Sequence, residues 1–81
     1  MLFNGVLPPE ATNRESRLIL SGGRSLLIEG HRGLLAYDSA CIKAKLPHAL
    51  LICQGADLVI SAFSADDMLI SGEIHSLELK R

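Results

Sequence analysis

The residues best suited to chemistry in this 81-residue chain lie within residues 26–37, which read LLIEGHRGLLAY. Glu29, His31 and Arg32 form the polar centre of this segment. A histidine beside a carboxylate can shuttle protons or bind a metal ion near neutral pH. A metal site needs three or four converging ligands, however, and no further ligand follows at a suitable spacing. The simpler interpretation is that His31 braces a turn through hydrogen bonds to local backbone groups.

A second possible cluster is a zinc site built from Cys41, Cys53, His48 and His75. The eleven residues between the two cysteines match no spacing typical of zinc sites. A two-residue turn formed by Pro47 and His48 would also place the cysteines on opposite faces of a sheet, because successive side chains alternate. We therefore expect Cys53 to be a small buried apolar residue, and we predict neither a metal site nor a cofactor.

Catalytic patterns are weak elsewhere in the chain. Asp66 and Asp67 form an acidic pair that suits a solvated loop. Ser21, Ser71 and Ser76 lack the G-x-S-x-G context of a hydrolase nucleophile. With no nucleophile–base pair at a meaningful spacing, we predict that the protein is not an enzyme.

The composition disfavours several further classes of function. Eight basic and nine acidic residues give a net charge of −1, and the aromatic residues are two Phe and one Tyr. Nucleic-acid binding is not expected without a basic stripe and stacking aromatics. No apolar run approaches the roughly 20 residues of a transmembrane helix, and the N-terminus lacks the pattern of a secretory signal. Two cysteines make no disulfide framework, so we expect a cytoplasmic protein, with a peripheral position at a membrane as an option.

The elements that must position these residues are short strands. Residues 1–16 are expected to form a leader or linker, and residues 17–81 a single β domain. Alternating apolar residues and turn signals predict strands at residues 17–21, 25–29, 34–38, 41–46, 49–53, 57–62, 68–71 and 74–79. Residues 26–37 are expected to form a hairpin with a charged tip, because Gly30 and Gly33 interrupt two short apolar runs. Seven or eight short strands predict an all-β fold, a small antiparallel sandwich or curled sheet.

A weak internal repeat leaves an alternative architecture open. Residues 19–28 align without gaps on residues 51–60, and both follow a strand, glycine turn and strand pattern. Repeated hairpins of this kind could stack as a short β-solenoid.

Strand alternation also predicts a second apolar face. If residues such as Leu26 and Ile28 point inward, a further set of apolar side chains must point outward, where polar residues are usual. An apolar patch of this size is typical of an interface. The leader's apolar residues or a second sheet could also cover it within the monomer. The predicted outward set is Leu27, Leu50, Ile52, Val59 and Leu69.

Three motifs resemble the YabP/YqfC family of sporulation proteins. They are LLIEGHRGLLAY at residues 26–37, QGADLVI at residues 54–60 and ISGEIHSLEL at residues 70–79. The resemblance extends from about residue 17 to residue 81. Cys53 and Gln54 depart from the family pattern. The residues of the first motif that could form a functional turn are Glu29, His31, Arg32, Gly33 and Tyr37.

The resemblance implies a β-sandwich-like domain that acts in endospore formation and has no known catalytic activity. It also implies a membrane-embedded sporulation protein as a partner. We therefore expect a structural or scaffolding protein that associates with itself or with such a partner. The alternative is a small ligand-binding or metal-binding module centred on His31 and Glu29.

Overall fold

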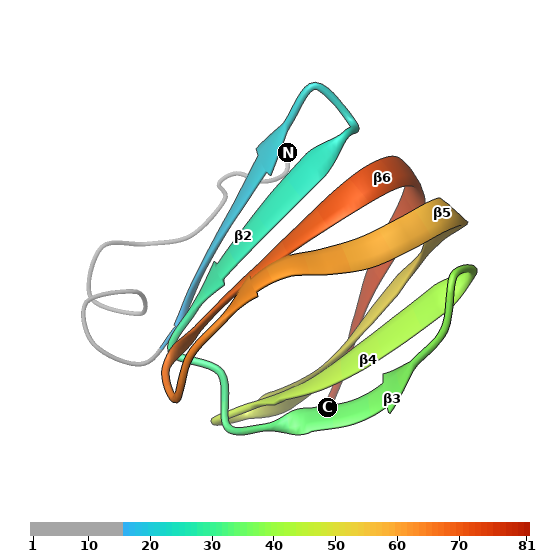
Figure 1. Ribbon diagram of the computed structural model, residues 1–81. Helices are drawn as coiled ribbons and strands as arrows, with labels where there is room; N and C mark the ends of the chain where they lie inside the picture. Colours follow the sequence, from blue (N-terminus) through green and yellow to red (C-terminus); the bar gives the residue numbers. More distant parts are fainter. Residues whose placement is uncertain (1–15) are drawn as a thin grey trace.

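The computed structural model describes residues 16–81 as six antiparallel strands in one sheet (Figure 1). The strands are β1 (Arg17–Ser21), β2 (Ser25–Glu29), β3 (Leu34–Tyr37), β4 (Cys41–Leu46), β5 (Ala49–Phe63) and β6 (Asp67–Lys80). Their order across the sheet is β1-β2-β6-β5-β4-β3. The predicted all-β class is confirmed. Apart from Ser16, the leader expected at residues 1–16 lies outside the described residues.

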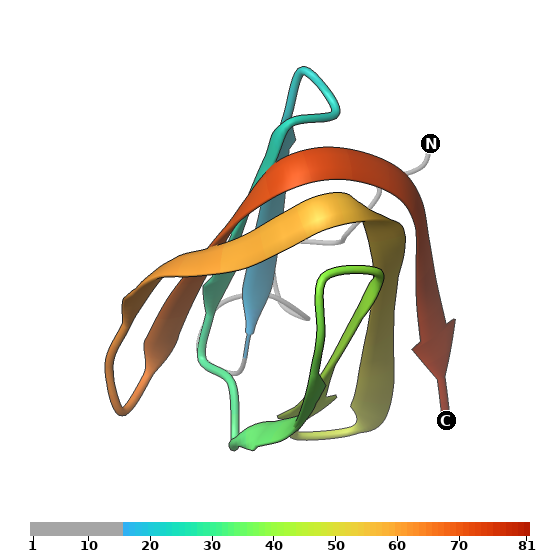
Figure 2. The same ribbon diagram turned by 45° about the vertical axis from the view of Figure 1, so that its right-hand side comes forward.

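Two long strands replace four of the expected short ones. Residues 49–53 and 57–62 belong to the single strand β5, while residues 68–71 and 74–79 belong to β6. The glycine-containing segment at residues 54–56, expected to be a turn, is a bend within β5. The β5–β6 register shifts between Gln54 and Gly55 and again between Ala56 and Val59. Such irregularities bend a strand pair sharply, and Figure 2 shows β5 and β6 arching over together.

The bend depends on an unusually close approach of the two backbones. A Cβ atom on Gly55 would overlap the carbonyl oxygen of Glu73. A Cβ atom on Gly72 would lie 2.5 Å from the carbonyl oxygen of Asp57, and Gly72 also has a φ of +134°. Only glycine fits such positions without displacing the neighbouring strand.

The bent pair divides the sheet into two halves that face each other. One half contains β1, β2 and the adjoining parts of β6 and β5, and the other contains β3, β4 and the remaining parts of β5 and β6. The buried hydrophobic residues form one cluster, with members on strands of both halves. They are Leu26, Ile28, Ile42, Ala44, Leu46, Leu51, Cys53, Leu58, Met68 and Ile70.

The hairpin predicted for residues 26–37 is wrong. β2 pairs with β1 on one side and β6 on the other, so no edge of β2 is left for β3. β3 instead pairs with β4 at the far edge of the sheet. Residues 30–33 therefore cross from one half of the sheet to the other. The solenoid alternative also fails, because residues 19–28 contain the β1–β2 hairpin whereas residues 51–60 lie within β5.

The two-residue turn at Pro47 and His48 joins β4 and β5 in the expected register. Leu46 pairs with Ala49, and Ile42 pairs with Cys53. Cys53 therefore shares the inward face of Ile42, as predicted from the alternation.

The close approach at the bend predicts a large cost for a single methyl group. Gly55→Ala should lower the free energy of unfolding by about 3 kcal/mol or more, because a neighbouring backbone cannot move aside easily. Gly22→Ala is the matched control, since nothing lies within 4 Å of its Cβ position and only its φ of +61° disfavours alanine. That control should cost about 1 kcal/mol. Urea unfolding of both variants measures the difference, and equal costs would contradict the importance of the bend.

Candidate functional site

The crossing segment, residues 30–33, joins two parts of the fold that are distant in sequence. The backbone N–H groups of Gly30 and His31 both donate to the carbonyl oxygen of Asp66, at 2.7 and 3.0 Å. Arg32 N–H donates to the carbonyl of Lys45 at 2.6 Å, and Lys45 N–H donates back to the carbonyl of Gly33 at 2.8 Å. The segment thus ties the β5–β6 turn to the end of β4, across the open side of the curled sheet.

The His31 ring lies inside this junction and is only 4% exposed. Its Nδ1 accepts a hydrogen bond from the backbone N–H of Gly33 at 3.0 Å. Nδ1 is therefore unprotonated, and Nε2 carries the proton that it donates to the carbonyl oxygen of Ser64 at 3.0 Å. The ring also stacks on Phe63, with 5.2 Å between ring centroids and 30° between planes. One side chain thus bonds its own turn and the β5–β6 turn.

These bonds limit what His31 can do chemically. A neutral imidazole has one nitrogen lone pair for ligation, and here that lone pair accepts the Gly33 N–H. Glu29 is also engaged, because its carboxylate pairs with the Arg17 guanidinium at 2.8 Å. Across residues 16–81, no three His, Cys, Asp or Glu side chains come close enough together to hold a metal ion. The geometry therefore offers no ligand pair of the kind that the alternative hypothesis requires.

The rest of the predicted functional turn is spread over the fold. The Arg32 side chain is exposed. Tyr37 lies at the end of β3, and its hydroxyl oxygen accepts a hydrogen bond from the backbone N–H of Ile60 at 3.3 Å. Sequence reasoning missed Asp38, whose Oδ1 accepts the N–H groups of Ala40 and Cys41 at 2.7 and 2.8 Å. An aspartate two or three residues before its bonding partners is a recognisable turn signal, so this residue could have been found.

The residues of the imagined zinc cluster do not converge. Cys53 is fully buried, whereas Cys41 is half-buried on the neighbouring strand. His75 is exposed and pairs with Glu73 at 3.3 Å. Burial, and to a smaller extent the nearby Cys41, raises the pKa of the Cys53 thiol. Cys53 is therefore an inert part of the core.

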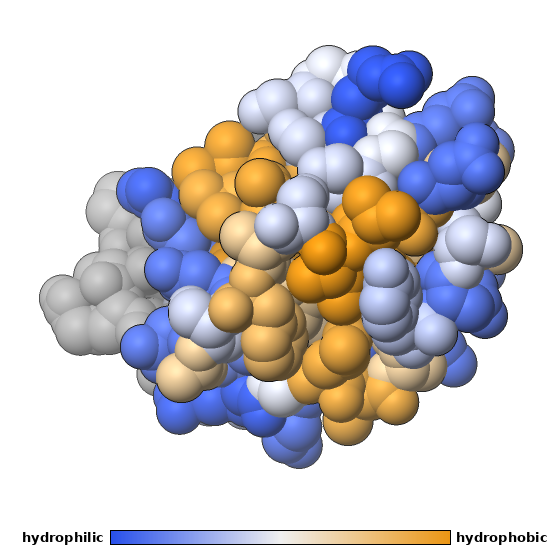
Figure 3. All heavy atoms as spheres, in the orientation of Figure 1, coloured by the Kyte–Doolittle hydropathy of each residue, from blue (hydrophilic) through white to orange (hydrophobic). Residues whose placement is uncertain are grey.

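The outer face of the first half of the sheet carries an apolar row. Ile19 pairs with Leu27, Leu27 with Leu69, and Leu69 with Ala62, so four apolar side chains lie side by side on β1, β2, β6 and β5. Val59, 48% exposed, lies on the same half of β5. Figure 3 shows apolar atoms at the surface over the β1–β2 hairpin and over β5. Ile19 and Ala62 were missed, although alternation within residues 17–21 would have pointed to Ile19.

The bend separates the other two predicted interface residues from this row. Leu50 and Ile52 lie on the first part of β5, on the second half of the sheet. Leu50 pairs with Lys45 and Lys80, and Ile52 with Lys43 and Glu78. Their neighbours are thus charged. The structure brings together Leu27, Val59 and Leu69 but places Leu50 and Ile52 elsewhere.

Comparison with known proteins identifies the relatives of this chain. A model of the YabP family matches residues 12–81. The chain belongs to the YabP/YqfC family. A member named uncharacterized protein YqfC, from Bacillus subtilis (strain 168), is 29% identical over 68 residues, which cover 84% of this chain and 73% of that relative. No solved structure matches. Among residues 16–81, no helix is long and apolar enough to cross a membrane.

Membership confirms the resemblance carried by the motifs, and the structure gives a physical role to the first of them. In this YabP/YqfC protein the glutamate of LLIEGHRGLLAY pairs across strands with Arg17, and the histidine closes the junction. The leucines and tyrosine that follow form β3.

The bonds of His31 predict that its main effect is on stability. His31→Ala should lower the free energy of unfolding by about 2–4 kcal/mol, because it leaves the Gly33 N–H and the Ser64 carbonyl unpaired and removes a buried ring. The control is His75→Ala, an exposed site that should change stability by less than about 0.5 kcal/mol. Denaturant unfolding with circular dichroism measures both. Equal stability of His31→Ala and wild type would show that the junction holds without the ring.

The two thiols should differ strongly in reactivity. With iodoacetamide at mildly alkaline pH, Cys41 should be alkylated first, and Cys53 should react only after unfolding. The reason is that the thiolate is the nucleophile, while burial of Cys53 both raises its pKa and blocks access. Peptide mapping by mass spectrometry, with and without guanidinium, checks this order. Alkylation of Cys53 at the rate of Cys41 in the native protein would contradict its place in the core.

Proposed function

We propose that this YabP/YqfC protein is a non-enzymatic assembly protein of endospore formation that associates with itself through the apolar row. The row is defined by Ile19, Leu27, Leu69 and Ala62. The observation that carries the proposal is its continuity across four adjacent strands. The solvated face of an antiparallel sheet normally carries polar residues, and contiguous exposed apolar residues mark interaction sites. The family resemblance supports the sporulation context.

The surroundings of the row suit a second copy of the same chain. At one end, Arg17, Glu29 and Asp67 lie side by side in register. At the other end, Ser21, Ser25 and Ser71 form a neutral polar row. A two-fold axis that runs along the apolar row, across the strands, would place the charged end of each copy over the serine end of its partner. The carboxylates of the two copies would then stay apart, and the apolar rows would cover each other.

A non-catalytic role agrees with the state of the most reactive residues. Both ring nitrogens of His31 are engaged in hydrogen bonds, and the thiol of Cys53 is buried. These groups hold the fold together rather than facing a substrate cavity. A membrane-embedded sporulation protein is the other partner that the family resemblance implies, and the same apolar row would serve it.

Light scattering coupled to size-exclusion chromatography tests self-association of the full chain over a range of concentrations. We expect wild type to form a stable oligomer. Ile19→Lys and Val59→Lys should both yield monomers, because each places a charge within or beside the apolar contact. The matched control is Leu20→Lys. Leu20 is 49% exposed, against 39% for Ile19, but it lies on the opposite face of the same strand.

The Leu20→Lys control separates disruption of a contact on the outer face from a general effect of placing a lysine on β1. If Leu20→Lys dissociates the oligomer as well as Ile19→Lys does, the contact does not lie on the outer face. If wild type is a monomer at every concentration, self-association is wrong, and a membrane-embedded partner becomes the binding test for the same variants. Ile52→Lys should leave the oligomer intact, because Ile52 lies beyond the bend.

A further inference from the structure

A groove lined by cationic side chains lies where β4 turns into β5, on the half of the sheet that does not carry the apolar row. It has a volume of about 460 Å³. Lys45, Lys80 and Arg81 contribute its positive charge, and Leu35 and Leu50 contribute apolar surface. None of these residues belongs to the apolar row, so the groove is a separate surface. We call it the basic groove.

Strand register explains how residues so distant in sequence meet. Lys45 on β4 pairs with Leu50 on β5, and Leu50 pairs with Lys80 on β6. Directly opposite residues on neighbouring strands share a face and lie about 5 Å apart. Two lysines therefore flank one leucine, and Arg81 follows directly. The backbone bond between Arg32 N–H and the Lys45 carbonyl brings a fourth cationic residue to this end.

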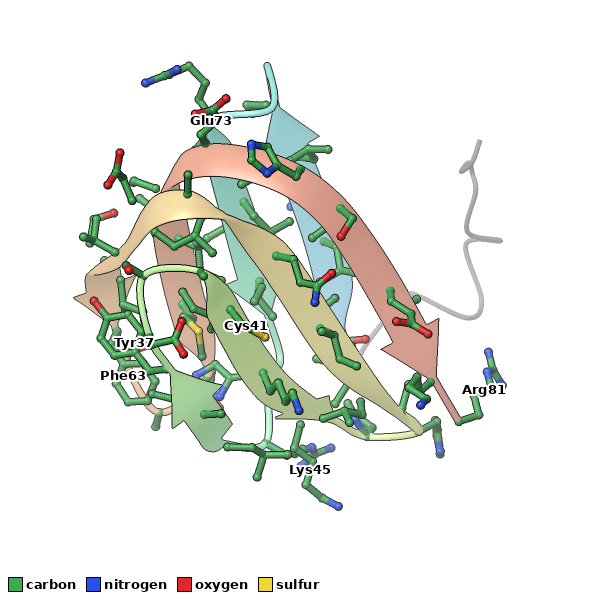
Figure 4. All side chains as sticks on the ribbon, turned by 90° about the vertical axis from the view of Figure 1, so that its right-hand side faces the viewer. Tyr37, Cys41, Lys45, Phe63, Glu73 and Arg81 are labelled. Atoms are coloured by element: carbon green, nitrogen blue, oxygen red, sulfur yellow. The ribbon has the colours of Figure 1, made fainter. Side chains whose placement is uncertain are left out.

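These cations have no carboxylate partner within residues 16–81. The ion pairs between Arg17 and Glu29 and between His75 and Glu73 involve none of these cations, and their residues do not line the groove. Glu78 lies two residues before Lys80 on β6 and is not among the residues that line the groove. In Figure 4, Lys45 and Arg81 lie at one end of the molecule and Glu73 lies at the opposite end. The uncompensated charge is thus local, although the whole chain carries a net charge of −1.

We propose that the basic groove binds an anionic lipid surface through its phosphate-bearing headgroups. The cationic side chains are exposed and lie around an open groove, an arrangement suited to many diffuse negative charges rather than to one small enclosed anion. Leu35, 57% exposed at the groove, supplies an apolar side chain that can enter the headgroup layer. This inference goes beyond the proposed function and does not depend on self-association.

Co-sedimentation with vesicles tests the proposal. The full chain should bind vesicles made of equal parts phosphatidylglycerol and phosphatidylcholine, and should not bind phosphatidylcholine alone. Added salt should weaken the binding, because it screens exposed charges. Lys45→Glu or Lys80→Glu should each lower the partition coefficient at least about tenfold, since each reversal replaces an attraction with a repulsion.

The matched control is Arg24→Glu. Arg24 is exposed in the β1–β2 turn, and its reversal changes the net charge by the same amount at a distant site. It should change the partition coefficient less than about twofold. Circular dichroism and thermal unfolding confirm that all three variants remain folded, which is expected because all three side chains are exposed.

Four outcomes would overturn the proposal. The first is equal loss of binding in Arg24→Glu and Lys80→Glu, which would mean that only net charge matters. The second is equal binding to neutral and anionic vesicles. The third is displacement from vesicles by millimolar inorganic phosphate at constant ionic strength, which would indicate a phosphate site. The fourth is binding to poly-glutamate without binding to vesicles, which would indicate an acidic polypeptide. The oligomeric state of Lys80→Glu, measured in parallel, separates failure of this proposal from failure of self-association.

Discussion

The contact between the backbones of β5 and β6 at the bend is the constraint on which the rest of the structure depends. Gly55 and Gly72 let the two strands approach so closely that they fold over as a pair. Because the pair is shared by both halves of the sheet, bending it turns one flat surface into two that enclose a core. The same bend brings the β5–β6 turn near the end of β4, where His31 joins them. It also divides the outer face into an apolar row and a basic groove.

Local patterns in the sequence were sufficient to predict the positions of most of the strands. The alternation of residues 41–46 and the turn at Pro47 fixed the β4–β5 register, including the inward position of Cys53. Glycine was the ambiguous signal. At Gly22 and Gly23 it marks a real hairpin turn, whereas at Gly55 and Gly72 it permits close packing inside a continuous strand. A sequence cannot distinguish these cases without knowing which backbone lies opposite.

Pairing between segments that are distant in sequence explains the remaining differences between the predicted candidate site and the observed one. The local half of the His31 interaction, the bond to Gly33, follows from turn chemistry, but Ser64 lies 33 residues away and nothing near His31 points to it. β2 and β3 were expected to pair because they are neighbours in sequence. β2 instead pairs antiparallel with β6, and only the complete topology reveals this pairing. Likewise, alternation assigned Leu27 and Leu50 to one face without revealing the bend between them.

The crossing segment also bears on the order of folding. The β1–β2, β4–β5 and β5–β6 hairpins each join strands that are adjacent in sequence, so each can form after closing a short loop. The bonds of residues 30–33 to Asp66, Ser64 and Lys45 require those hairpins to be in place already. We therefore expect these bonds to form late, after the transition state for folding. Interactions that form late chiefly slow the escape from the native state. We therefore expect the buried His31 to slow unfolding more than it speeds folding, so that it affects the lifetime of the folded protein.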